Sequence, residues 1–231
     1  MVQRVLVLHS ALTISRSFID YPYFSDLGAL QIAACLQDSN YQTTIVDAFA
    51  YEESSTELIG TDEVWLGAPL EKLQSQLRND SSFDLIAVNF TPFHLPPNRS
   101  EPLGTLLREL RERHEDTPII LADMYQSGQH YLDVPGEDVL GAYPEVDVYL
   151  KYEAETTLPH LAKTLLKDGR PSTAYSLLGE RPESLDELPL PFWEGIDLES
   201  RGNFLLSVVN NLGRGHWEFP IDATTFPVLT S

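Results

Sequence analysis

The feature that most constrains the fold is an alternation of short apolar segments and helical stripes through the first 170 residues. Five segments are rich in β-branched residues, as buried parallel strands are: 4–9, 41–47, 83–90, 118–122 and 146–150. Apolar residues at helical spacing predict a helix after each strand, at 27–36, 70–77, 103–113, 134–142 and 155–166. The sequence therefore predicts an α/β fold, a flavodoxin/Rossmann-like doubly wound parallel sheet of about five strands in the order 2-1-3-4-5.

The alternation ends near residue 170, which suggests a division of the chain. Residues 1–170 are predicted to form the α/β domain, and residues 171–231 an irregular linker with many Pro and Gly residues and turns. Within that linker Leu205–Val209 is the clear apolar run, and we predict a strand there.

Composition excludes several classes of function. The formal net charge is −20, from 15 Lys and Arg against 35 Asp and Glu, so we expect no binding to nucleic acid. Cys35 is the one cysteine, which excludes an internal disulfide and a cysteine-held metal cluster. The sequence has no apolar run of membrane-spanning length and no signal peptide, so we expect no membrane association and a cytoplasmic protein.

Four stretches, in their order and spacing, carry a resemblance to a known family. Tyr21-Pro22 with the helix start at Leu27–Leu36 is similar to the family's Tyr-Pro-Pro-Leu-Gly and Leu-Ala-Ala-x-Leu, and Tyr41–Ala48 to its second strand ending in Asp-Ala. Val146–Leu158 resembles its Asp-x-Val-Val-x-Gly-Glu-Gly-Glu-x-Thr run, and Leu185–Phe192 its linker into a second domain. The family is that of cobalamin-binding domains that precede a radical S-adenosylmethionine domain.

The resemblance implies a function for the chain. It would be the cobalamin-binding N-terminal region of a B12-dependent radical S-adenosylmethionine enzyme, which methylates an unactivated carbon or rearranges a radical. The segment Phe226–Ser231 resembles the stretch just before the family's Cys-rich loop. The [4Fe–4S] cluster and S-adenosylmethionine are therefore expected only in a downstream radical domain of the same polypeptide, absent from this chain, which alone would be inactive.

Ligands of a doubly wound sheet bind beyond the carboxyl ends of its strands, at the predicted loops 10–26, 91–100, 123–133 and 152–155. The resemblance implies that cobalamin would contact residues in and beside these loops: Ser10, Tyr21, Leu27, Gly28, Asn89, Thr91, Asp123, Met124, Glu153 and Glu155. The family's Asp-x-His-x-x-Gly motif is missing after the first strand, so we expect base-off cobalamin without a ligand from His9.

Departures from the family pattern leave an alternative open. Ala122-Asp123-Met124 stand where the family has Gly-Gly, and Tyr152 stands where it has Gly. The alternative is a degenerate flavodoxin-like domain for interaction or substrate gating that no longer binds cobalamin. The sequence indicates no catalytic residue, no metal site and no Gly-rich phosphate loop.

Overall fold

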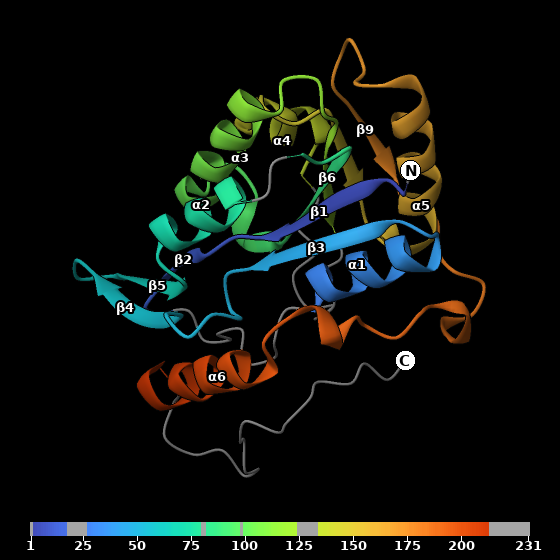
Figure 1. The fold of residues 1–231 in the computed structure, drawn as a ribbon. Coiled ribbons are helices and arrows are strands. Elements are labelled where there is room, and N and C mark those ends of the chain that lie inside the picture. The colour runs from blue at the N-terminus through green and yellow to red at the C-terminus, as the bar shows by residue number, and fades with distance from the viewer. Residues whose placement is uncertain (1, 18–26, 80–81, 98, 124–133, 213–231) are drawn as a thin grey trace.

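A computed structural model of the chain describes residues 2–17, 27–79, 82–97, 99–123 and 134–212. Its centre is a six-stranded parallel sheet in the order β3-β1-β6-β7-β8-β9 (Figure 1). The strands in chain order are β1 (Arg4–His9), β3 (Gln42–Asp47), β6 (Leu85–Phe90), β7 (Ile119–Asp123), β8 (Val148–Lys151) and β9 (Tyr175–Leu178). The first five reproduce the predicted order 2-1-3-4-5, so the doubly wound α/β fold is confirmed.

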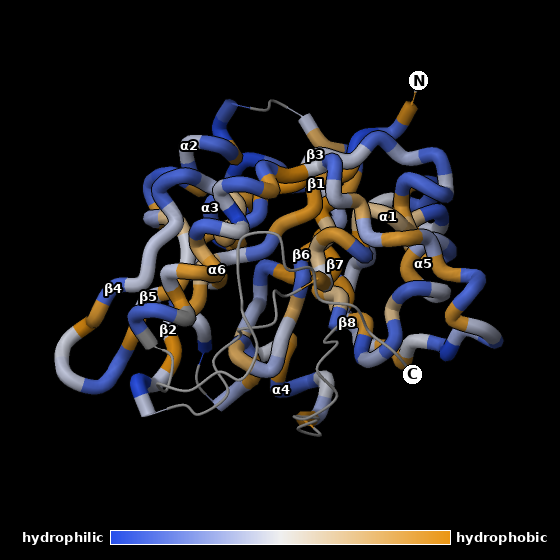
Figure 2. The backbone as a smooth tube through the Cα atoms, turned by 90° about the horizontal axis from the view of Figure 1, so that it is seen from below, coloured by the Kyte–Doolittle hydropathy of each residue, from blue (hydrophilic) through white to orange (hydrophobic). Residues whose placement is uncertain are grey.

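Helices cover both faces of this sheet (Figure 1). One face carries α1 (Gly28–Asp38) and α5 (Ala154–Asp168), and the other carries α2 (Leu70–Asn79), α3 (Glu101–Arg113) and α4 (Gly136–Ala142). Because strand side chains alternate between faces, Val5 and Val7 pack towards α1 and α5, whereas Leu6 and Leu8 join the opposite core. The residues of the central strand β1 are accordingly largely hydrophobic (Figure 2).

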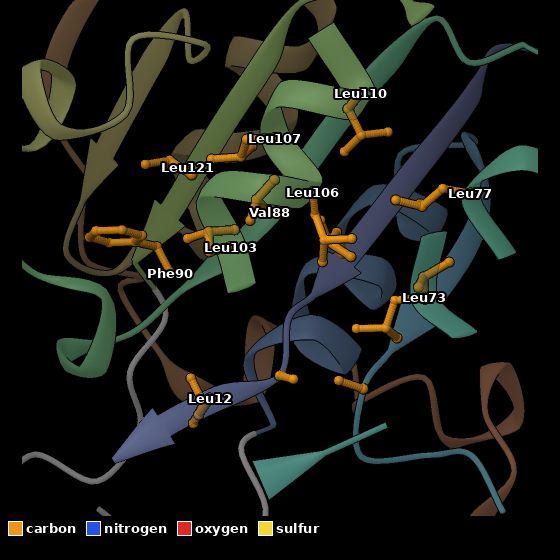
Figure 3. Packing of buried hydrophobic residues seen from close by; sticks show 14 of the residues in the cluster. Leu12, Leu73, Leu77, Val88, Phe90, Leu103, Leu106, Leu107, Leu110 and Leu121 are labelled. Carbon is orange, nitrogen blue, oxygen red and sulfur yellow. The ribbon is translucent and has the colours of Figure 1, made fainter. Parts of the chain in front are cut away.

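The larger core lies between the sheet and the helices α2 and α3. The α3 stripe of Leu103, Leu106, Leu107 and Leu110 is fully or almost fully buried against strand residues such as Val88 (Figure 3). Burying a leucine stabilises a fold by about 1.5–3 kcal/mol relative to leaving it exposed, so this stripe holds α3 in place.

A second, three-stranded antiparallel sheet extends from the carboxyl end of β1. Its order is β2-β5-β4, from β2 (Leu12–Ser15), β4 (Ser55–Ile59) and β5 (Glu63–Gly67). These stretches were predicted to be loop, because the three strands are short and most of β4 is exposed. Gly60, with φ of +62°, makes the turn between β4 and β5.

The chain beyond residue 170 adds two elements to this body. β9 extends the parallel sheet beside β8, and α6 (Leu198–Leu212) packs on the carboxyl side of β3 and beside β4. The strand predicted at 205–209 is wrong, since this run lies inside α6. Asp197 starts that helix by accepting hydrogen bonds from the amides of Glu199 and Ser200, and the buried Phe204 and Val208 then recur at helical spacing.

Three single-turn helices complete the described structure: η1 (Pro92–His94), η2 (Leu185–Glu187) and η3 (Trp193–Gly195). None of the helices in the described ranges combines the length and the apolar character needed to cross a bilayer.

Candidate functional site at the carboxyl edge of the sheet

Buried polar side chains gather where β1, β3 and β6 end, which we call the carboxyl edge. Six polar residues at this edge are at most 1% exposed: His9, Ser10, Asp47, Asn89, Thr91 and His94. Burying polar groups costs free energy unless each is hydrogen-bonded, and open parallel sheets bind their ligands at this edge. The concentration therefore marks the carboxyl edge as the candidate site.

Asp47 is the charged centre of the edge. The parallel register places it opposite His9, and His9 Nδ1 lies 2.8 Å from Asp47 Oδ1. Arg201, from α6, forms an ion pair with Asp47 Oδ2 although it lies 154 residues away in sequence. Burial alone would raise the pKa of Asp47, but the charges of Arg201 and His9 outweigh it and lower that pKa to about 2. Asp47 is thus ionised, and His9 Nδ1–H donates to it.

His94 is a neutral imidazole held by its neighbours. Burial, followed by the charge of His9, lowers its pKa to about 3. The amide of Thr91 donates to His94 Nδ1 at 3.0 Å, so the ring proton is on Nε2 and is donated to Ser10 Oγ at 3.1 Å. Because His94 donates to Ser10 rather than accepting from it, this pair is not an activated serine nucleophile.

Gly28 lets the start of α1 approach the end of β6. A Cβ atom at this position would lie 2.0 Å from Asn89 Oδ1, closer than any real contact. The glycine is therefore required by this close approach, and it brings the first turn of α1 against Asn89.

The connection from β8 to α5 has an uncommon backbone. Tyr152 and Glu153 have φ of +59° and +26°, in the region that side chains rarely adopt. Glu153 forms an ion pair with Arg181 at 3.0 Å, and Lys151 donates to the carbonyl of Val134 at 3.0 Å. Burial raises the pKa of Glu155, which follows in the first turn of α5.

A cavity of about 330 Å³ opens at the carboxyl end of β3. Its walls come from β3, from the segment after it, from α2 and from the residues just before α6, and they include Ile45, Asp47, Tyr51, Lys72 and Ile196. The volume lies within the range of about 300–1,000 Å³ that is usual for ligand pockets. Through Asp47 the cavity adjoins the buried polar cluster.

The structure places eight of the ten residues predicted to bind cobalamin at or just beyond the carboxyl ends of the parallel strands. They are Ser10, Leu27, Gly28, Asn89, Thr91, Asp123, Glu153 and Glu155, whereas Tyr21 and Met124 lie outside the described residues. Gly28 meets Asn89, and Ser10 and Thr91 meet through His94. Glu153 instead pairs with Arg181, away from these groups.

Asp47, His94, Arg201 and the cavity were not predicted from the sequence. Asp47 and His9 each end a predicted strand, and the two strands are neighbours in the predicted order. The contact between this pair could therefore have been predicted from the sequence. The contact of Arg201 with Asp47 could not have been predicted, because it depends on how α6 packs. Within the described ranges, no three His, Cys, Asp or Glu side chains are grouped so that they could hold a metal ion.

Comparisons with known proteins give a limited result. No family model matches the chain, and no curated protein matches it. Two solved structures resemble its fold, each at 12% identity: a putative phosphomethylpyrimidine kinase from Bacteroides thetaiotaomicron with pyridoxal (TM-score 0.38) and the pyridoxal kinase from Entamoeba histolytica (TM-score 0.36). The match covers 81% of this chain and 66% of the first, and 91% of this chain and 90% of the second. At these scores the likeness assigns no activity to this chain.

These comparisons contradict the cobalamin interpretation. The two solved structures named above are kinases, and neither is described as binding cobalamin, S-adenosylmethionine or an iron–sulfur cluster. The alternative of a degenerate interaction domain gains no support from them either. The motifs led to a wrong prediction for a physical reason. They lie on α1 (Leu27–Leu36), β3 (Tyr41–Ala48) and β8–α5 (Val146–Leu158), and any doubly wound sheet contains such elements. The motifs therefore indicate the fold and do not indicate a cofactor.

Proposed function

We propose that the chain is a small-molecule-binding domain whose ligand occupies the cavity at the carboxyl end of β3. One observation carries this proposal: Asp47 is among the residues that line the cavity, and its buried carboxylate joins His9 and Arg201 in the polar cluster behind that wall. A concave site at this edge, with a few fixed polar groups and apolar walls, is the usual form of a ligand site in this fold.

The lining excludes some ligand classes. Among the described lining residues, the carboxylates of Glu52, Glu53 and Asp197 stand against the single cation Lys72, while the carboxylate of Asp47 is buried and paired with Arg201. With a net charge of −20 over the whole chain, this lining repels phosphate groups and nucleic acid. A neutral or positively charged organic molecule suits it, and a cytoplasmic location and independence from membranes remain part of the proposal.

The described groups support binding more than covalent catalysis. His94 is neutral and donates a hydrogen bond to Ser10, and Asp47 accepts from His9 and pairs with Arg201. The described groups at this edge are therefore fixed polar groups, without an activated nucleophile among them. The polar cluster is then a rigid support that fixes the inner wall of the cavity.

A cavity-filling variant tests this proposal. Ala50 lines the cavity and is 6% exposed, so Ala50→Leu reduces the space without changing a charge. Ala174 is exposed and lies outside the cavity lining, so Ala174→Leu is the matched control. A library of small amines, neutral heterocycles and carboxylates is screened by thermal shift and then by calorimetry.

The expected result is at least one compound that stabilises the wild type and Ala174→Leu but not Ala50→Leu, whose fold is checked by circular dichroism. Compounds that bind all three proteins equally, or no binding by any compound, would overturn the proposal.

A further inference from the structure

The charges around the cavity are unbalanced. Among the described lining residues, the carboxylates of Glu52, Glu53 and Asp197 stand against the one ammonium group of Lys72. Asp47 is ionised and paired with Arg201, while Asp197 is engaged as the first-turn acceptor of α6, at 3.0 Å from the amide of Glu199. Glu53 binds Lys72, and a hydrogen bond from that lysine lowers the pKa of Glu53. The cavity is therefore negative at neutral pH.

The chain's own lysine already shows how this wall binds an ammonium group. Lys72 Nζ lies 2.6 Å from Glu53 Oε1 and 5.3 Å from the centre of the Tyr51 ring. A carboxylate beside an aromatic face is a recurrent site for organic cations. Lys72 and Glu53 are 30% and 47% exposed, and exposed ion pairs contribute little, so an incoming cation can replace Lys72 there at small cost.

The remaining walls suit the body of such a ligand. Ile45 and Ile196 contribute aliphatic surface at the same cavity, and its volume of about 330 Å³ holds a molecule with a short carbon skeleton. We infer that the cavity takes a small organic cation, a primary amine or quaternary ammonium with a short aliphatic body, whose charged end lies between Tyr51 and the Glu52–Glu53 carboxylates. This inference rests on the proposed function and names the chemical class of its ligand.

Choline and its neutral isostere 3,3-dimethyl-1-butanol are the probes, because they share a shape and differ in charge. Calorimetry on the full chain should show choline binding at least about fivefold more tightly than the alcohol, with the preference falling at high salt. Glu52→Gln should weaken choline binding, whereas Glu112→Gln, the same change on exposed α3 surface outside the cavity, should leave it unchanged.

Two further variants separate the inference from a merely structural role of these residues. Lys72→Met removes the competing ammonium and should strengthen choline binding several-fold, a gain that lost stability cannot produce. Tyr51→Leu should weaken it about two- to fivefold, with its fold checked by circular dichroism.

Each remaining outcome decides the question. Equal or tighter binding of the alcohol, with Ala50→Leu abolishing it, would overturn the cation inference and leave the proposed function standing. No gain from Lys72→Met would also overturn the inference. Binding of neither probe would overturn the cation inference, and it would overturn the proposed function as well if the wider library held no cavity-dependent compound.

Discussion

Asp47 holds a negative charge where water does not reach, with Arg201 and His9 as its partners. Asp47→Asn keeps the shape of the side chain but leaves the guanidinium of Arg201, 3% exposed, without its anion. Removing one partner of a buried pair is strongly destabilising, so we predict a loss of about 3–5 kcal/mol in the free energy of unfolding, measured with urea. The control is Asp168→Asn, the same change in an exposed pair with Lys167, which should alter stability little; equal losses would show that Asp47 is not the anchor described.

His94 makes stability depend on pH in a defined direction. Its folded pKa of about 3 lies below the unfolded value of about 6.5, so only the unfolded chain takes up this proton between those values. Stability from this group is complete above about pH 6.5 and is lost as the pH falls towards about 3, at up to about 1.4 kcal/mol per pH unit.

Asp47 acts in a lower window of pH. Its folded pKa of about 2 lies below an unfolded value of about 3.9, so its contribution is lost as the pH falls from about 4 to about 2. Urea unfolding between about pH 7 and pH 5 therefore isolates His94 from Asp47. His94→Asn, which can still accept from Thr91, should flatten the slope there, with exposed His160→Asn as the control. An unchanged slope in His94→Asn would contradict the neutral, buried state of this ring.

At the scale of elements, α1 is positioned by the absence of a side chain at Gly28. Gly28→Ala places a Cβ 2.0 Å from Asn89 Oδ1, so the start of α1 or the buried amide must move. We predict a loss of about 1–3 kcal/mol by urea unfolding, the usual cost of overpacking. In contrast, Gly141→Ala in α4 meets open space and should be neutral or stabilise by about 0.5–1 kcal/mol. If both substitutions had the same effect, the close approach at Asn89 would not be what fixes α1.

The elements also show how far the sequence predicts this fold. Strands such as 4–9 and 83–90 are predicted from the sequence, because a strand that is buried on both faces consists almost entirely of apolar, often β-branched residues. β4 and β5 were missed because both are short and β4 has no buried residue, although Gly60 between two β-rich runs was a readable turn signal. The run 205–209 reads equally well as strand or helix, and packing of Phe204 and Val208 decides for helix.

Part of the candidate site could also be predicted from the sequence, and part could not. Residues at strand ends, such as Ser10 and Asn89, could be placed at the carboxyl edge from the predicted topology alone. The partners Arg201 and Lys72 come from α6 and α2. Their positions could not be predicted, because the strand pattern does not determine the angles at which helices pack. The cofactor could not be inferred, because motifs that follow from a doubly wound sheet are shared by domains with many functions.

For the whole molecule, the net charge of −20 acts against compactness. Self-repulsion is screened by salt, so we predict that the melting temperature rises between low and moderate NaCl concentration, by about 2–4 °C if the gain is about 1 kcal/mol. Differential scanning calorimetry measures the melting temperature at each salt concentration. The control is a neutral osmolyte at the same osmolality. A melting temperature that falls with salt would mean that attractive ion pairs, and not net repulsion, dominate the surface.

The central claim is that the cavity at the end of β3 is the ligand site of this protein. Crystals soaked with a fragment set that includes small amines test it most directly. The account predicts difference density between Tyr51 and Ile196, with amines over-represented among the bound fragments and Lys72 displaced. Fragments that bind instead at the opposite edge of the sheet, beside Asn40 and His160, with the cavity at Asp47 empty throughout, would contradict it.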